Sequence, residues 1–141
     1  MKRTVFAVLI LILTIGCTSK YNRGTYDLYL IPEGYEGVIT VTYNVKDAPK
    51  LEKEGKYDVI PVHANGRYET SNPMYDYGEV IDQYYYVDQK GKRTVIDPLC
   101  VQVKGTGGST SSDGVETHFT KMEVTNSECG EDFMLGTRPN N

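Results

Sequence analysis

Short runs in which apolar and polar residues alternate fill most of the chain and predict β-strands. The clearest run covers residues 38–45, where Ile39, Val41 and Tyr43 alternate with Thr and Asn. Because successive side chains of a strand point to opposite faces, this run predicts a strand with one face on a core. The other expected strands cover residues 26–31, 57–62, 67–70, 84–87, 93–96, 99–103, 115–124 and 133–135.

Turn residues separate these runs. Asn65-Gly66 predicts a hairpin, because both residue types tolerate the positive φ of a type I′ turn. Residues 88–91 predict a second tight turn, and residues 105–114 (GTGGSTSSDG) predict a flexible surface loop with nothing to bury. No amphipathic helix is evident among these residues. We therefore expect an all-β fold, an antiparallel two-sheet sandwich of about seven or eight short strands, transthyretin-like or immunoglobulin-like.

The first 16 residues have a different pattern from the rest. Lys2 and Arg3 precede an apolar run that begins at Val5 and ends just before Cys17. The run has about 11 strongly apolar residues, short of the ~20 that a membrane-spanning helix needs. The segment therefore has the pattern of a signal peptide.

Residues 13–17, Leu-Thr-Ile-Gly-Cys, resemble the lipobox of bacterial lipoproteins. In that family the cysteine thiol takes a diacylglycerol and the signal peptide is cut just before it, although the position held here by Thr14 is usually Leu. The resemblance implies a mature chain that begins at Cys17 and is held on a membrane by acyl chains. Ordinary secretion and an uncleaved anchor are the alternatives. The expected organisation is a signal peptide (1–16), a lipidated cysteine and tether (17–25), a single β-sandwich domain (26–135) and a loose tail (136–141).

Charge adds one constraint on partners. The full chain has 15 basic and 19 acidic residues, and loss of Lys2 and Arg3 with the signal peptide leaves 13 against 19, a net charge of −6. This balance excludes a basic nucleic-acid-binding protein. An acidic body is not attracted to anionic lipid, so we expect a tethered domain that stands off the surface.

A second resemblance covers about half of the mature chain. Residues 30–37, Leu-Ile-Pro-Glu-Gly-Tyr-Glu-Gly, resemble the opening of a family of uncharacterised bacterial lipoprotein domains with a hydrophobic-Ile-Pro-Glu-Gly-Tyr-x-Gly motif. Further matches within residues 26–97 are Asn65-Gly66, Thr70-Ser71, Gly78, Tyr84-Tyr85, Asp88 and Gly91. The resemblance implies a surface lipoprotein β-domain and brings no known activity with it.

Two cysteines remain for the folded domain, Cys100 and Cys129. Outside the cytoplasm such a pair favours a disulfide, which would tie the strand near residue 100 to the C-terminal segment. Two buried free thiols, or a reactive or metal-binding thiol, are the alternatives.

Metal-binding patterns are weak in this chain. His63 and His118 are the only histidines, and no HxxxH or CxxC spacing accompanies them. Asp76, Glu79 and Asp82 form an acidic stretch around a glycine, but their spacing departs from the EF-hand pattern. We therefore expect no metal site and no cofactor.

Tyrosines gather in one stretch of the sequence, and five of them lie within twelve residues. Tyrosine can stack on a sugar ring or anchor a protein interface. On a strand, however, Tyr84 and Tyr86 share one face while Tyr85 points to the other, so one set would pack in the sheet. The candidate binding face comprises Tyr75, Tyr77, Tyr84 and Tyr86, with Asp76 and Asp82 beside them.

These observations favour a non-enzymatic function. No GxSxG or SxxK motif is present, and no Trp. The hypothesis is a membrane-anchored extracytoplasmic lipoprotein, held through Cys17 on the cell membrane or on an outer membrane, that acts as a binding or structural module of the envelope. Its partner would be another envelope protein or a glycan. A small envelope hydrolase, or a carrier of a ligand or metal ion, is the alternative.

Overall fold

The computed structural model describes residues 25–74 and 79–137. Within them lie nine strands, one 3-10 helix and one short α-helix. The strands are β1 (Asp27–Pro32), β2 (Gly37–Tyr43), β3 (Glu52–Glu54), β4 (Tyr57–Pro61), β5 (Arg67–Glu69), β6 (Gln83–Val87), β7 (Arg93–Val95), β8 (Val101–Thr110) and β9 (Glu116–Val124), and the helices are η1 (Pro98–Cys100) and α1 (Glu131–Met134).

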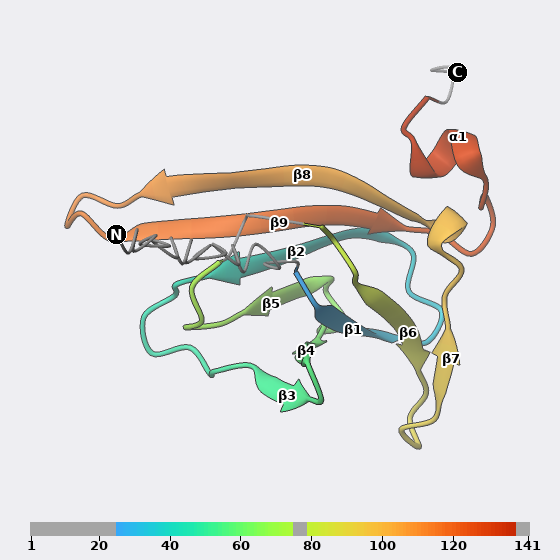
Figure 1. Ribbon diagram of the computed structural model, residues 1–141, viewed down its shortest axis with the longest axis horizontal. Helices are drawn as coiled ribbons and strands as arrows, with labels where there is room; N and C mark the ends of the chain where they lie inside the picture. Colours follow the sequence, from blue (N-terminus) through green and yellow to red (C-terminus); the bar gives the residue numbers. More distant parts are fainter. Residues whose placement is uncertain (1–24, 75–78, 138–141) are drawn as a thin grey trace, which may run out of the picture.

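The strands form two sheets, with the orders β3-β4-β1-β6-β7 and β5-β2-β9-β8 (Figure 1). The expectation of an all-β sandwich is confirmed, but the expectation of purely antiparallel sheets is wrong. β1 runs parallel to both β4 and β6, and β2 runs parallel to β5. The physical reason is that β1 and β2, although consecutive, enter different sheets. The parallel neighbours within a sheet are then joined by crossovers, which bring the chain back in the same direction.

Both sheets contribute to one core between them. Side chains at every second position of the central strands are buried, as the alternation in the sequence predicts. The apolar residues with almost no exposed surface are Tyr29 and Ile31 of β1, Ile39 and Val41 of β2, Ile60 of β4, and Met122 and Val124 of β9.

Asn65-Gly66 forms a turn, but not the expected type I′ hairpin. Gly66 has a φ of 75°, whereas Asn65 is not among the residues with positive φ. The Asn65 side chain instead accepts a hydrogen bond from the backbone N–H of Arg67 (3.1 Å). The strand that follows, β5, pairs with β2 in the other sheet. The turn therefore carries the chain from one sheet to the other.

The expected flexible loop at residues 105–114 is wrong over most of its length. β8 continues through the glycines to Thr110 and pairs with β9 throughout, and only residues 111–114 turn. A backbone ladder needs no apolar side chains, so composition alone misled here. At Gly107 a Cβ would lie 2.5 Å from the Phe119 ring, which shows that the ring covers the bare backbone. The β8–β9 hairpin forms the long arm of the molecule in Figure 1.

The C-terminal segment closes one end of the sandwich. The expected short strand at residues 133–135 is wrong, because Glu131–Met134 forms the helix α1 and buries Phe133. Cys100 and Cys129 form a disulfide, so that expectation is confirmed and the free-thiol alternatives are excluded. The bridge and the helix together hold the segment after β9 against η1 and the start of β8.

Candidate functional site

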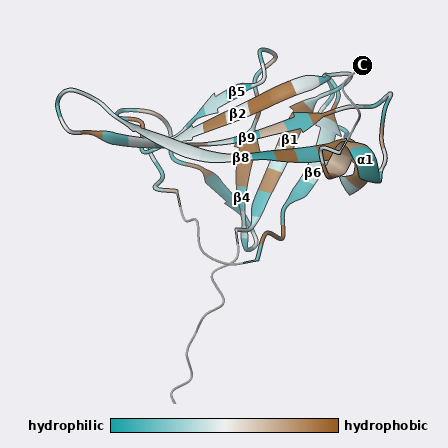
Figure 2. Ribbon diagram, turned by 90° about the horizontal axis from the view of Figure 1, so that it is seen from above, coloured by the Kyte–Doolittle hydropathy of each residue, from teal (hydrophilic) through white to brown (hydrophobic). Residues whose placement is uncertain are grey.

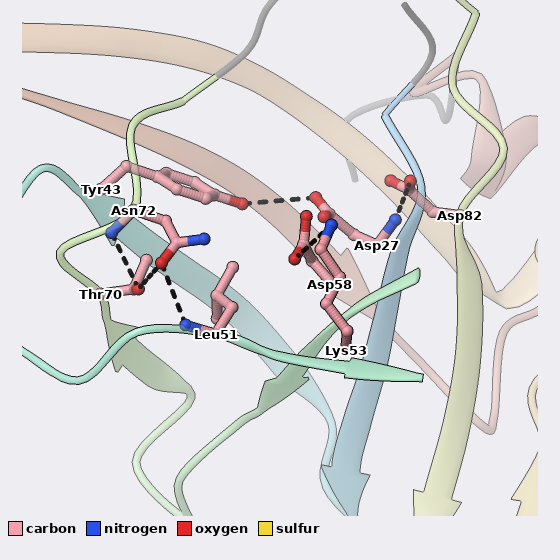
Figure 3. Close-up of polar contacts among 8 residues, drawn as sticks. All are labelled: Asp27, Tyr43, Leu51, Lys53, Asp58, Thr70, Asn72 and Asp82. Atoms are coloured by element: carbon pink, nitrogen blue, oxygen red, sulfur yellow. Dashed lines mark hydrogen bonds and ion pairs between the residues drawn. The ribbon is translucent and has the colours of Figure 1, made fainter. Parts of the chain in front are cut away.

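Three carboxylates lie side by side where three parallel strands begin. Asp27 of β1 is the register partner of Asp58 of β4. Asp82 immediately precedes β6, and the pairing of Leu28 with Gln83 sets it level with Asp27. Since register partners on neighbouring strands point to the same side, all three carboxylates face the inside of the sandwich, as Tyr29 does. Figure 3 shows them grouped at this end of the sheet.

Each carboxylate has a different polar partner. The backbone N–H of Asp27 donates to Oδ1 of Asp82 (3.0 Å), and the hydroxyl of Tyr43 donates to Oδ2 of Asp27 (3.4 Å). Asp58 forms an ion pair with Lys53, whose Nζ lies 2.9 Å from Oδ1. Asp58 is thus paired with a cation, whereas the hydrogen bonds that Asp27 and Asp82 accept come from neutral donors, a tyrosine hydroxyl and a backbone N–H (Figure 3).

Burial dominates the acid–base behaviour of this cluster. Burial, followed by the charges of Asp82 and Asp58, raises the pKa of Asp27 to about 7, against the opposing hydrogen bonds of Tyr43 and Tyr29. Burial also raises the pKa of Asp82 to about 6, although hydrogen bonds from the backbone N–H of Asp27 and from the side chain of Thr25 oppose the rise. Like charges in a site poor in water favour retention of a proton. The Asp27–Asp82 pair therefore titrates near neutral pH.

Tyrosines form the inner wall of the cluster. Tyr29 and Tyr84 stack with their ring centroids 5.2 Å apart. Burial raises the pKa of the hydroxyls of Tyr29, Tyr43 and Tyr84 above the usual tyrosine value, and the nearby carboxylates add to that rise. These hydroxyls stay protonated and act as donors or as packing groups.

The chemistry of this arrangement is that of a proton-holding pair. Two carboxyl groups with pKa values near 6 and 7 could act as general acid and base. In the described part of the chain, no three His, Cys, Asp or Glu side chains are grouped so as to hold a metal ion. His63 lies beside the ring of Tyr68 (5.5 Å), and His118 lies against Gly108 in the β8–β9 arm.

The candidate binding face is only partly within the described residues. Tyr75, Asp76 and Tyr77 lie outside them, as does Cys17. Tyr84 and Tyr86 are half-buried and pack against the core, and the hydroxyl of Tyr86 donates to the carbonyl of Tyr35 (3.0 Å). Asp82 belongs to the carboxylate cluster.

Asp27 and Asp58 were not among the expected site residues. A signal for Asp27 was present, because the alternation of residues 26–31 puts it on the same strand face as Tyr29 and Ile31. A carboxylate at a core-facing position is the pattern to look for. The parallel pairing that brings Asp58 beside it had no counterpart in the sequence pattern.

Two residues of the loop between β1 and β2, Tyr35 and Glu36, make structural hydrogen bonds. The hydroxyl of Tyr35 donates to the carbonyl of Val38 (2.7 Å) and lies where a Cβ on Gly66 would be. Oε1 of Glu36 accepts hydrogen bonds from the segment after β9. These bonds join the β1–β2 loop to the C-terminal part of the domain. The donors are the hydroxyl of Thr125 (3.0 Å), the N–H of Asn126 (2.6 Å), and the N–H and hydroxyl of Ser127 (3.0 Å each).

Within the two described stretches, no helix is long and apolar enough to cross a bilayer.

Comparison with known proteins gives a family and a solved structure. No curated protein matches the chain. A crystal structure from Bacillus anthracis, described as a "Putative Lipoprotein", is similar to this chain with 38% identity and a TM-score of 0.78, over 84% of this chain and 82% of that one. Residues 23–133 match the model of a family of unknown function, DUF6843. The expectation of an uncharacterised lipoprotein domain family is confirmed, and the chain belongs to DUF6843.

Proposed function

We propose that this chain is a lipid-anchored extracytoplasmic protein whose β-sandwich serves as a non-catalytic binding or structural module of the cell envelope. The disulfide is the observation that carries the proposal. It pairs Cys100 with Cys129, the two cysteines of the folded domain, and leaves Cys17 of the lipobox-like segment for acylation. Structural disulfides persist in oxidising compartments, which agrees with a domain outside the cytoplasm.

The comparisons support the same proposal. The similar structure from Bacillus anthracis is described as a lipoprotein candidate, and its fold extends over most of both chains. In this chain the folded domain begins within eight residues of Cys17, so a lipid on that cysteine would keep the domain close to a membrane. The family has no assigned function, so membership in it gives no sign of catalysis.

The anchor is tested by substitution of the cysteine. We expect Cys17→Ala to abolish incorporation of a labelled fatty acid and to release the protein from the membrane fraction. Ser19→Ala, two residues away in the same polar segment, is the matched control and keeps both properties. A Cys17→Ala protein that remains labelled and membrane-bound would overturn the proposal.

A small hydrolase is the second candidate, and one observation favours it. The raised pKa values of Asp27 and Asp82 are those of groups able to exchange a proton near neutral pH. A hydrolase of this kind would lose turnover of ester or glycoside substrates in both Asp27→Asn and Asp82→Asn while keeping its fold. The module that we propose shows no such turnover in the unmodified chain. Elemental analysis of the purified protein tests the metal-carrier alternative.

A further inference from the structure

Three parallel strands begin at the end of the sandwich where the polar segment after Cys17 leads into the domain. β4, β1 and β6 run in the same direction, so their first residues lie level with one another. Tyr26 directly precedes β1, Tyr57 opens β4, and Ile81 lies two residues before β6. The registers place all three in one row on the outer face of the sheet, the side opposite to Asp27.

Large aliphatic side chains are exposed at this end. Val80 has 60% of its surface exposed and Ile81 has 37%. Both are attached to the first described residue, because Val80 forms a parallel bridge with Thr25 and the N–H of Ile81 donates to the Thr25 carbonyl (3.0 Å). Figure 2 shows the chain just before β6 as hydrophobic. Apolar surface therefore lies directly beside the point where the tether joins the domain.

An aromatic pair and a lysine continue this surface across the sheet. The rings of Tyr26 and Tyr57 meet edge to face at 5.8 Å. Nζ of Lys56 lies 4.3 Å from the centre of the Tyr26 ring and 5.5 Å from that of Tyr57. Val80 lies beside them at the end of the strands but on the side of Asp27, because it is the bridge partner of Thr25. We call the four residues on the outer face, Tyr26, Lys56, Tyr57 and Ile81, the tether-side patch.

Aliphatic side chains beside tyrosines and a lysine are the set of groups that bilayer interfaces favour. Tyrosine places its ring among the acyl chains and its hydroxyl among the headgroups. Lysine lays its methylenes along apolar surface while its ammonium reaches the phosphates. We propose that the tether-side patch rests in the interface of the same membrane that holds the Cys17 lipid. This inference depends on the lipid anchor of the proposed function.

The length of the tether identifies the bilayer as the occupant. Seven residues separate Cys17 from Thr25, and fully extended they span roughly 25 Å. The patch adjoins Thr25, so the tether holds it within reach of the headgroups at all times. A surface tethered in this way meets its target at a high effective concentration, and even a weak contact is populated.

Charge decides which side of the tether-side end can approach a membrane. The mature chain has a net charge of −6, and its body as a whole is repelled by anionic lipid. Lys56 supplies positive charge within the patch, and the acidic Glu54 nearby is already paired with Arg93 at 2.9 Å. Asp27, Asp58 and Asp82 lie at the same end but face the inside of the sandwich, and the exposed Glu79 precedes Val80. The side of this end that approaches the headgroups is therefore the outer face, which carries Lys56 and the two tyrosines.

The chain has no Trp, so a single introduced indole reports its own surroundings. The lipidated full chain carrying Ile81→Trp is reconstituted into vesicles of phosphatidylglycerol and phosphatidylethanolamine with brominated acyl chains. Val38→Trp is the matched control, because Val38 is 48% exposed and is the second residue of β2, next to the loop that leaves the far end of β1. Flotation of the vesicles shows independently whether the protein is anchored.

We expect the emission of Ile81→Trp to shift to the blue and to fall about twofold in brominated vesicles, while that of Val38→Trp stays unchanged. Protein that floats but shows equal, unquenched emission from both variants overturns the membrane contact and leaves the anchor intact. Emission that is already blue-shifted in dilute detergent and unaffected by bromine also overturns it, because another protein surface then covers the patch. Protein that does not float overturns the anchor and the contact together.

Discussion

The two ends of β1 hold carboxylates in opposite electrostatic states. Beyond its C-terminal end, Glu36 accepts four hydrogen bonds from the segment 125–127, and these donors hold the pKa of its exposed carboxyl below the usual value. At its N-terminal end, Asp27 is buried beside Asp82 and Asp58, and its pKa rises to about 7. The same functional group is stabilised as an anion at one end and as an acid at the other.

The difference shows what each end of the domain contributes. Backbone and hydroxyl donors surround Glu36, so its charge is satisfied and the β1–β2 loop is fixed to the segment after β9. A disulfide reinforces that segment two residues further on. The Asp27 end instead keeps like charges close together in a site poor in water. We therefore expect the Glu36 end to provide stability and the Asp27 end to limit it at neutral and alkaline pH.

Removal of the disulfide should have the largest effect on stability and tests the role of the Glu36 end. The double substitution Cys100→Ser and Cys129→Ser opens a loop of sequence separation 29 that contains the whole β8–β9 hairpin. Loop-closure entropy predicts a loss of about 3–4 kcal/mol in the free energy of unfolding. Denaturant unfolding measures it, and wild-type protein treated with a reductant should show the same loss. A double variant with the wild-type midpoint would contradict the role given to this end.

Gly66→Ala should have the next largest effect, and it acts on the same end. A Cβ there would lie 1.9 Å from the hydroxyl of Tyr35 and 2.6 Å from the carbonyl of Val38, at a φ of 75°. We expect a loss of about 2–3 kcal/mol from overlap and backbone strain. Gly55→Ala is the matched control, because its φ of 61° carries strain alone and no atom lies within 4 Å. Equal thermal unfolding of the two variants would show that the Tyr35 contact is unimportant.

Strand pattern, turns and the disulfide could be predicted from the sequence, and the carboxylate cluster could not. Alternation over residues 38–45 identified β2, and Asp88 with Gly91 marked a hairpin that the structure contains between β6 and β7. Alternation reports which face of a strand is buried but not which strand lies beside it. The pairing of β1 with β4 and β6, which assembles Asp27, Asp58 and Asp82, therefore had no signature in the sequence.

Composition misled where backbone pairing decides the structure. Residues 105–110 are glycine-rich and polar, yet they pair with β9, and the Phe119 ring takes the space above Gly107. For Glu36, the sequence carries no signal of a structural role. In the sequence it is one acidic residue in a turn, and its importance depends on Thr125 and its neighbours, which lie about ninety positions away.

Asp27→Asn tests the Asp27 end with an intermediate effect. In wild-type protein the folded pKa of about 7 exceeds the unfolded value of 3.8, so the folded state binds the extra proton between these values. The contribution of this group to stability is therefore greatest in acid and declines as pH rises from about 4 to 7. The amide removes this penalty, and we expect the variant to be about 1–2 kcal/mol more stable at pH 8 and equal to wild type near pH 4.

Denaturant unfolding between pH 4 and pH 8 measures this difference. Asp88→Asn is the matched control, since the Asp88 side chain accepts hydrogen bonds in the exposed β6–β7 turn, away from the three carboxylates. If Asp27→Asn were less stable than wild type at pH 8, the ionised carboxylate would be needed there, and the proposed cost of the cluster would be wrong.

Glu36→Gln should have the smallest effect and the opposite sign. The folded pKa of Glu36 lies below the unfolded value, so its stabilisation is present above about pH 4.5 and is lost as pH falls through the folded pKa. The amide keeps one oxygen acceptor for Thr125 and Ser127 but loses the charge that strengthens those bonds. We expect a modestly lower denaturant midpoint at pH 7 and no difference from wild type at pH 3. Both single variants thus converge on wild type in acid and diverge from it in opposite directions at neutral or higher pH. If Glu36→Gln and Asp27→Asn shifted the midpoint the same way at pH 8, the two ends of β1 would not differ in the manner that their hydrogen bonds and burial indicate.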